Sequence, residues 1–184
     1  MTEKKCAIIL VGLETIKNPD GSFKCWADTF LDNANTWKHD HSEYTTKILD
    51  SRDYMDLDDP LESIWEELQK ESIDLLFYSG HSDETTLYLI SKYRVELESY
   101  QRFIDFDTDW SYIPFNENAS IYLSGCQAGG KEGKKFDTCI AQDIADKTGT
   151  KTFAFTSKSS QHKKEHGYYQ VPDIGGFVSF TKNI

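Results

Sequence analysis

Two residues with side chains suited to covalent catalysis each follow an apolar segment of the chain. His81 comes shortly after Ile73–Tyr78, and Cys126 comes shortly after Ser120–Leu123. A cysteine becomes a strong nucleophile as the thiolate, and an imidazole is the side chain best suited to exchange protons near neutral pH. A glycine directly precedes each residue, which suits a sharp turn that projects the side chain out of a sheet. Together these residues predict a Cys–His catalytic pair.

The pair can act together only if neighbouring strands carry the two residues to one edge of a sheet. Short β-branched or aromatic segments bounded by turn residues predict buried strands. These segments are Cys6–Gly12, Tyr44–Leu49, Ile73–Tyr78, Ser120–Leu123 and Thr150–Thr156. Apolar residues three and four apart predict helices between most of them. The helices are Phe23–Trp37; Leu61–Leu68, which begins with the Asp59–Pro60 cap; and Phe136–Lys147, which ends at Gly149.

The order of these elements predicts an α/β fold. Helical crossovers join parallel strands, and functional groups gather beyond the carboxyl ends of such strands. We therefore expect a three-layer α/β/α sandwich with a mostly parallel central sheet, formed by residues 1–184 as a single domain. An irregular polar stretch is expected to hold a short strand over Thr86–Ser91. Farther on, Lys158–His166 is expected to be a polar loop, and Tyr168–Val171 with Gly176–Thr181 a C-terminal hairpin.

The segments around His81 and Cys126 resemble the caspase-like cysteine peptidases (clan CD), and most closely their CHAT-type branch in bacteria. In that family a hydrophobic strand ends in Ser-Gly-His-Gly, and a later strand ends in Ser-Ala-Cys-x-Thr-Gly. The matching segments here are Tyr78-Ser79-Gly80-His81-Ser82 and Leu123-Ser124-Gly125-Cys126-Gln127-Ala128-Gly129. The separation of 126 − 81 = 45 residues is also close to the roughly 50 residues found in caspases. The resemblance extends over roughly residues 5–181.

This resemblance implies a cysteine-type endopeptidase, a hydrolase that works through an acyl-enzyme intermediate and needs no cofactor. The Cys126 thiolate would attack the peptide carbonyl, and His81 would protonate the leaving amine. The backbone N–H groups of Ser82 and Cys126 would bind the oxyanion. Ser82 stands where the family usually has glycine. This replacement is the chain's main departure from the family pattern.

The resemblance also implies a substrate pocket near the catalytic pair. Its expected residues are Asp83, Gln127, Thr156 and Ser157. The caspase signature QAC[RQG]G is met only at Cys126-Gln127, so the aspartate preference of caspases is not expected. The expected partners are a protein or peptide substrate and an activating sensor or partner protein.

Two other functions compete with a peptidase. The first is a caspase-like fold that has lost activity and serves as an interaction scaffold, which the serine at position 82 keeps open. The second is a ligand-binding or signalling domain of flavodoxin or receiver type. Such domains expect a phosphate-binding loop or an acidic cluster after the first strand, and Val11-Gly-Leu-Glu-Thr15 supplies neither.

Charge and hydropathy limit the partners. A formal net charge of −11 would repel a phosphate backbone, so nucleic acid is not an expected partner. The start of the chain, Met1–Lys5 followed by Cys6–Leu13, has too short an apolar segment for a signal peptide, and no other segment is expected to span a membrane. The composition therefore predicts a soluble protein.

The remaining cysteines and histidines are expected to be structural. Four cysteines at irregular spacing, without a CxxC pair, predict neither a disulfide framework nor a zinc site, and fit a reducing, cytoplasmic location. Core packing accounts for Cys6, Cys25 and Cys139. Solvated loops account for His39, His41, His162 and His166, so no metal is expected. A solvated helix start accounts for Lys131, Lys134 and Lys135 better than a self-cleavage site does.

Overall fold

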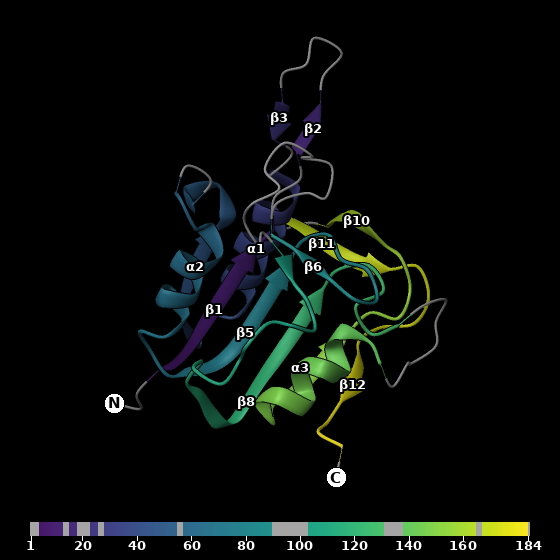
Figure 1. Cartoon of the computed structure of the whole chain (residues 1–184). Coiled ribbons are helices and arrows are strands. Elements are labelled where there is room, and N and C mark those ends of the chain that lie inside the picture. The colour runs from purple at the N-terminus through teal and green to yellow at the C-terminus, as the bar shows by residue number, and fades with distance from the viewer. Residues whose placement is uncertain are drawn as a thin grey trace.

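A six-stranded sheet forms the centre of the molecule (Figure 1). The computed structural model describes residues 4–12, 15–17, 23–25, 28–54, 57–89, 103–130, 138–164 and 167–183. The strand order is β4-β1-β5-β8-β9-β12. The strands are β1 (Lys5–Val11), β4 (Tyr44–Asp50), β5 (Ile73–Ser79), β8 (Phe115–Ser124), β9 (Lys151–Ala154) and β12 (Val178–Phe180). All neighbours pair in parallel except β12, which runs antiparallel to β9. The expected α/β class and mostly parallel sheet are confirmed.

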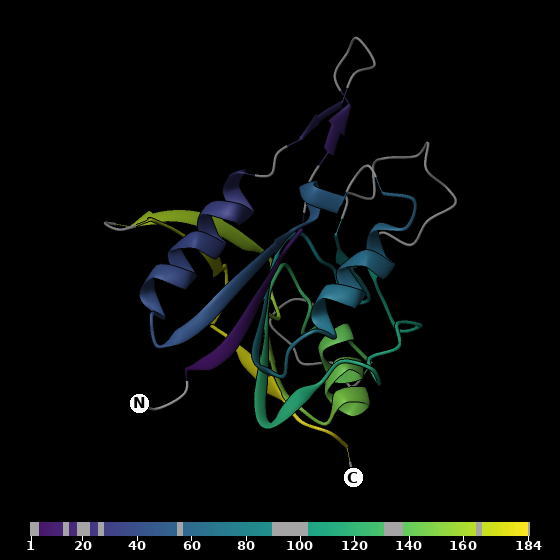
Figure 2. The ribbon, with the colours of Figure 1, turned by 90° about the vertical axis from the view of Figure 1, so that its left-hand side faces the viewer.

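Helices lie on both faces of this sheet (Figure 2). Side chains alternate between the faces of a strand, so β1 directs Ile8 and Leu10 to one face and Ala7, Ile9 and Val11 to the other. The first face packs against α2 (Pro60–Leu68) and α3 (Ile140–Thr148). The second face packs against α1 (Asp28–Asp40). Strands buried on both faces explain the continuous apolar segments in the sequence.

The helix ends match local sequence signals where those signals exist. The Asp59 side chain accepts a hydrogen bond from the Glu62 N–H at 3.0 Å and caps α2 as expected. Helix α3 ends at Gly149, whose φ of 71° is the left-handed conformation that favours glycine. It begins at Ile140 rather than at Phe136, which lies outside the described residues. None of the described helices has the length and apolar character to cross a membrane.

The expected start of the first helix is wrong. The segment β3 (Phe23–Cys25) pairs antiparallel with β2 (Thr15–Lys17), and α1 begins only at Asp28. Backbone hydrogen bonds to β2 take the place of a first helical turn. The helical spacing of apolar residues does not reveal such pairing, because it reports on a face and not on a partner.

The expected pairing near the C-terminus is also wrong. The segment predicted to be a polar loop contains β10 (Ser159–Lys164), which pairs antiparallel with β11 (Gly167–Pro172). The last strand, β12, joins the sheet edge at β9 and forms no hairpin with β11. Burial of Phe180 in the core accounts for this choice. The hairpin is therefore β10–β11, and its polar first strand carries no apolar signal.

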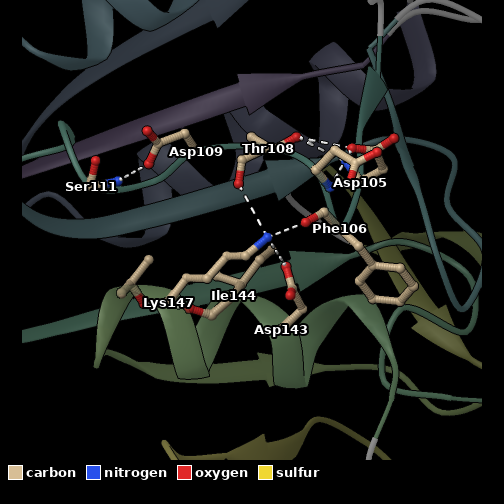
Figure 3. A network of polar contacts seen from close by, with 10 residues as sticks. Asp105, Phe106, Thr108, Asp109, Ser111, Asp143, Ile144 and Lys147 are labelled. Carbon is tan, nitrogen blue, oxygen red and sulfur yellow. Dashed lines mark hydrogen bonds and ion pairs between the residues drawn. The ribbon is translucent and has the colours of Figure 1, made fainter.

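The chain leaves the sheet between β5 and β8. There β6 (Leu87–Tyr88) pairs with β7 (Phe103–Ile104), so the short strand expected over Thr86–Ser91 is confirmed over its described central residues. The loop after β7 lies against α3 through Lys147 (Figure 3). The Lys147 Nζ donates to the Phe106 carbonyl and, at 3.3 Å, to the Thr108 carbonyl, and it pairs with Asp143 at 3.0 Å. These contacts hold the excursion on the α2–α3 face.

Candidate active site

Strands β5 and β8 bring His81 and Cys126 to one edge of the sheet. The two strands are parallel neighbours, and Ser79 lies opposite Ser124 in their register. His81 and Cys126 each follow this pair by two residues (79 + 2 and 124 + 2). Both residues are half-buried. The prediction that the two residues leave neighbouring parallel strands at the same edge is confirmed.

The turns that carry these residues pack closely against each other. The Ser82 hydroxyl donates to the Cys126 carbonyl at 2.7 Å. A Cβ atom on Gly125 would lie 2.3 Å from Ser82 Oγ, and one on Gly80 would lie 2.4 Å from the Tyr78 hydroxyl. Neither glycine is among the described residues that have a positive φ angle. The two glycines are thus required by close approach rather than by a positive φ angle.

Hydrogen-bond donors from the β10–β11 hairpin reach the Cys126 sulfur. The Ser159 N–H donates to Sγ at 3.4 Å, and Ser159 Oγ lies 3.4 Å from Sγ. The Gln170 side-chain amide donates to Ser159 Oγ at 2.7 Å, which leaves the hydroxyl proton available to point at the sulfur. Ser124 in turn donates to the Gln170 side-chain oxygen at 3.4 Å. The thiol can in turn donate to the Ser159 carbonyl, 3.8 Å from Sγ, so Ser159 offers the sulfur both donor and acceptor groups.

Tyr78 holds the backbone at the other candidate residue. Its hydroxyl donates to the His81 carbonyl at 2.6 Å, and the same carbonyl accepts from the Tyr88 N–H at 2.9 Å. Complete burial raises the pKa of Tyr78 well above its usual value, so the hydroxyl keeps its proton. The His81 ring also makes an edge contact with Phe30, with 4.8 Å between the centroids. The imidazole therefore stands on a fixed backbone and against α1.

Helix α1 connects the surroundings of the two candidate residues. The Asn33 amide donates to Ser79 Oγ at 2.9 Å, and its oxygen accepts from the Gln170 N–H at 3.4 Å. Ser79 Oγ donates to the Phe30 carbonyl at 3.0 Å. A path of direct contacts thus runs from the thiol through Ser159, Gln170 and Asn33 to the helix that touches His81. Gln170 and Asn33 are not predictable from the sequence, since neither follows a strand nor belongs to a motif.

The expected oxyanion donors, the backbone N–H groups of Ser82 and Cys126, lie at the same edge of the sheet as the candidate pair. Ser82 lies opposite Leu87 in a short antiparallel bridge. The backbone hydrogen bonds on either side of this bridge run from the Asp83 N–H to the Thr86 carbonyl at 3.0 Å and from the Tyr88 N–H to the His81 carbonyl at 2.9 Å, so neither uses the Ser82 N–H. The role of the Ser82 and Cys126 N–H groups as oxyanion donors stays a prediction.

The four residues expected to line a substrate pocket differ in their surroundings. Asp83 accepts from the Tyr88 hydroxyl at 2.7 Å. Gln127 has a φ of 57°, the only positive value at a non-glycine residue that the structure describes, and its N–H donates to the Ser157 carbonyl at 2.9 Å. Thr156 and Ser157 are buried, and the Ser157 hydroxyl accepts from the Ile174 N–H at 3.1 Å. Their roles in substrate binding stay predictions.

Two of the other histidines lie in regular elements and not in the expected loops: His39 is in α1 and His162 is in β10. Cys139 is fully buried in the core. Burial, aided by a hydrogen bond with Glu71, raises the pKa of Cys6 to about 11. The side chain of Cys25 and all of His166 lie outside the described residues. Within the described part of the chain, no three His, Cys, Asp or Glu residues form a group that could hold a metal ion.

Comparisons with known proteins add no relative to this geometry. No family model, no curated protein and no solved structure matches the chain. Any assignment of function therefore rests on the residues at the sheet edge.

Proposed function

We propose that the chain is a caspase-like cysteine endopeptidase with Cys126 as nucleophile and His81 as general acid and base. One observation carries the proposal: His81 and Cys126 follow the paired ends of neighbouring parallel strands by the same two residues. This places two complementary reactive groups at the edge where parallel sheets concentrate their functional residues. The proposal includes the finer fold, a three-layer α/β/α sandwich of the caspase-like type.

The chemistry requires a proton to move from sulfur to nitrogen and back. His81 accepts the Cys126 proton, and the thiolate forms a C–S bond with the scissile carbonyl carbon. Backbone N–H groups of Ser82 and Cys126 stabilise the resulting oxyanion. The C–N bond breaks as the imidazolium protonates the leaving amine, and His81 then deprotonates the water that hydrolyses the thioester. The Ser159 donors stabilise the sulfur each time it is anionic.

Two of the departures from the caspase-like pattern, at positions 82 and 125, meet each other in space. The family pattern pairs glycine after the histidine with alanine before the cysteine, whereas this chain has Ser82 and Gly125. A Cβ atom at position 125 would lie 2.3 Å from Ser82 Oγ and 2.9 Å from Ser82 Cβ, so both side chains cannot be present together. The glycine at position 125 therefore leaves the space that the Ser82 side chain occupies.

A catalytically inactive scaffold is the second candidate. The observation that favours it is the contact of Ser159 with the thiol, because a substrate must approach a sulfur that already has neighbours. The two candidates differ in the reactivity that they expect of Cys126. An active thiol alkylates rapidly at neutral pH, whereas a covered structural thiol reacts as slowly as the other cysteines.

Two measurements test the proposal. The first is iodoacetamide labelling of the intact protein at pH 7, read by peptide mass spectrometry. We expect Cys126 to react faster than Cys6, whose thiol has a pKa of about 11, and faster than the buried Cys139. Equal, slow labelling of all three would favour the scaffold.

The second measurement is cleavage of a peptide library by the wild type, Cys126→Ala and His81→Ala. We expect no turnover from Cys126→Ala and a loss of about 10²–10⁴-fold from His81→Ala. Cys6→Ala is the matched control and should cleave like the wild type, since Cys6 lies at the start of β1, away from the edge. Undiminished cleavage by Cys126→Ala would contradict the proposal.

A further inference from the structure

A pocket of about 370 Å³ opens on the α1 face of the sheet. Its walls come from α1, the start of β4, strands β5 and β8, and β11. The aromatic side chains that line it are Trp37, Tyr44, Phe77, Tyr122, Tyr169 and Phe177. A volume in this range suits a small ligand or one or two amino-acid side chains.

The pocket is continuous with the surroundings of Cys126. Ser124 and Gln170 line it, and the two side chains are hydrogen-bonded to each other at 3.4 Å. Gln170 also donates to Ser159 Oγ, which lies 3.4 Å from the Cys126 sulfur. One pair of side chains therefore forms a wall of the pocket and part of the support of the thiol.

The charges that line the pocket are negative. Asp40 and Glu43 are its two carboxylates, and the described lining residues include no lysine or arginine. The Tyr169 hydroxyl donates to Asp40 at 2.6 Å and, with His39, lowers the pKa of Asp40, which keeps this carboxylate ionised at neutral pH. His41 also lines the pocket, stacked on Trp37 at 4.0 Å, and would oppose a cation only when protonated.

We propose that this pocket binds an arginine side chain of a peptide. The planar guanidinium can stack on aromatic rings while its N–H groups reach carboxylates, and the pocket supplies both kinds of partner. An uncharged apolar side chain would use the rings alone, whereas a guanidinium would also be attracted by Asp40 and Glu43, the two exposed carboxylates of the lining. Calling this peptide a substrate rests on the proposed peptidase function. Binding of its arginine side chain in the pocket does not depend on that function.

Binding is measured on Cys126→Ala, so that no cleavage disturbs the equilibrium. The probes are three blocked pentapeptides, Ala-Ala-X-Ala-Ala, with X as arginine, its neutral isostere citrulline, or leucine. Quenching of tryptophan fluorescence reports occupancy, with Trp37→Phe identifying the part of the signal that arises in the pocket. We expect the arginine peptide to bind about tenfold more tightly than the citrulline peptide.

Substitutions in the pocket test which groups provide this preference. Glu43→Gln should weaken binding of the arginine peptide at least about threefold, and Asp40→Asn combined with Glu43→Gln should abolish the preference over citrulline. Tyr169→Phe reports separately on the loss of its bond to Asp40. Glu117→Gln is the matched control, because Glu117 is an exposed carboxylate of β8 that does not line the pocket. It should leave binding unchanged.

Three results would overturn the proposal. The first is equal or tighter binding of the leucine or citrulline peptide, which would make the pocket a neutral apolar site. The second is no saturable binding of any probe. The third is self-association of the chain, seen by sedimentation, that is weakened by Tyr122→Ser, which would make a second copy the occupant. Failure of the peptidase proposal is a separate result, cleavage by Cys126→Ala, and leaves the arginine preference standing.

Discussion

Differences between chemically identical residues are decided by their immediate neighbours. Cys6 and Cys126 are both half-buried thiols. Cys6 lies in strand β1, and Cys126 follows strand β8. Glu71 accepts a hydrogen bond from the Cys6 thiol at 3.5 Å, and burial raises the pKa of that thiol to about 11. At Cys126 the neighbouring groups come from Ser159: its N–H and hydroxyl can donate to the sulfur, and its carbonyl, at 3.8 Å, can accept from the thiol. The partner of Cys6 is therefore a carboxylate, whereas these partners of Cys126 are uncharged groups.

At this scale we predict that Gly125→Ala destabilises the protein, because the new methyl group would meet the Ser82 side chain. The new Cβ would lie 2.3 Å from Ser82 Oγ, and we expect a loss of about 1–3 kcal/mol in the free energy of unfolding, as for other overpacking substitutions. Urea denaturation measures this change. The double variant Ser82→Gly/Gly125→Ala should recover most of the loss, since it removes the two atoms nearest to the new Cβ, Ser82 Oγ at 2.3 Å and Ser82 Cβ at 2.9 Å.

Gly176→Ala serves as the control for the same backbone change. A Cβ at Gly176 would meet no atom within 4 Å. Its stability should stay within about 0.5 kcal/mol of the wild type. If the double variant loses as much free energy of unfolding as Gly125→Ala alone, Ser82 is not what obstructs the new methyl group.

Elements of this fold are joined to each other by charged groups as well as by apolar faces. Lys47 of β4 pairs with Glu67 of α2 at 2.6 Å, and Lys70 pairs with the other oxygen of the same carboxylate. Hydrogen bonds from Lys47 first and from Lys70 second lower the pKa of Glu67 from 4.5 to about 2. The carboxylate thereby connects α2 to the edge strand of the sheet.

The lowered pKa predicts a pH-dependent contribution of Glu67 to stability. Because the folded-state pKa lies below the unfolded value, this contribution is complete above pH 4.5 and is lost as the pH falls toward 2. We expect Glu67→Gln to lower the free energy of unfolding by about 0.5–1 kcal/mol at pH 7, because the pair is partly exposed. The difference from the wild type should shrink at pH 3.

Urea midpoints of both proteins at the two pH values measure this effect. Glu66→Gln, at an exposed neighbouring position of α2, controls for the loss of one negative charge and should show a smaller change. A Glu67→Gln difference that is as large at pH 3 as at pH 7 would contradict the electrostatic origin.

Across the whole molecule, the hairpin β10–β11 joins the last part of the chain to helix α1. Three hydrogen bonds connect them: Tyr168 N–H to Thr36 Oγ1 at 3.2 Å, Tyr169 hydroxyl to Asp40 at 2.6 Å, and Gln170 N–H to Asn33 at 3.4 Å. The same hairpin places Ser159 on the Cys126 sulfur. The surroundings of the thiol therefore depend on a contact between segments separated by 129 residues or more in sequence.

We predict that Gly167→Ala loosens this contact. A Cβ at position 167 would lie 2.0 Å from Thr36 Oγ1, so the hairpin has to move away from α1. Hydrogen exchange should become faster in β10 and β11, while β1 and β5 in the centre of the sheet keep their protection. Unchanged exchange in the hairpin of Gly167→Ala would show that α1 does not hold it.

Patterns within a single segment predicted much of the sheet and two helix ends. Strands β1, β4 and β5 are visible as β-branched or aromatic segments because burial on both faces demands apolar residues in sequence. The start of α2 at Asp59–Pro60 and the end of α3 at Gly149 are visible because caps are chemical requirements of single residues. The positions of His81 and Cys126 at strand ends follow from the same local logic.

What the sequence by itself determined, then, is the apolar segments, the caps and the position of two reactive residues beside glycines. Only the tertiary structure decided that the polar segment Ser159–Lys164 is a strand, that β12 pairs with β9, and that Gln170 supports the thiol. It also decided why Gly125 is a glycine, since the obstacle is a side chain from another strand end. The physical reason is that burial leaves a periodic pattern in one segment, whereas a hydrogen-bond partner or a close approach between distant segments leaves none.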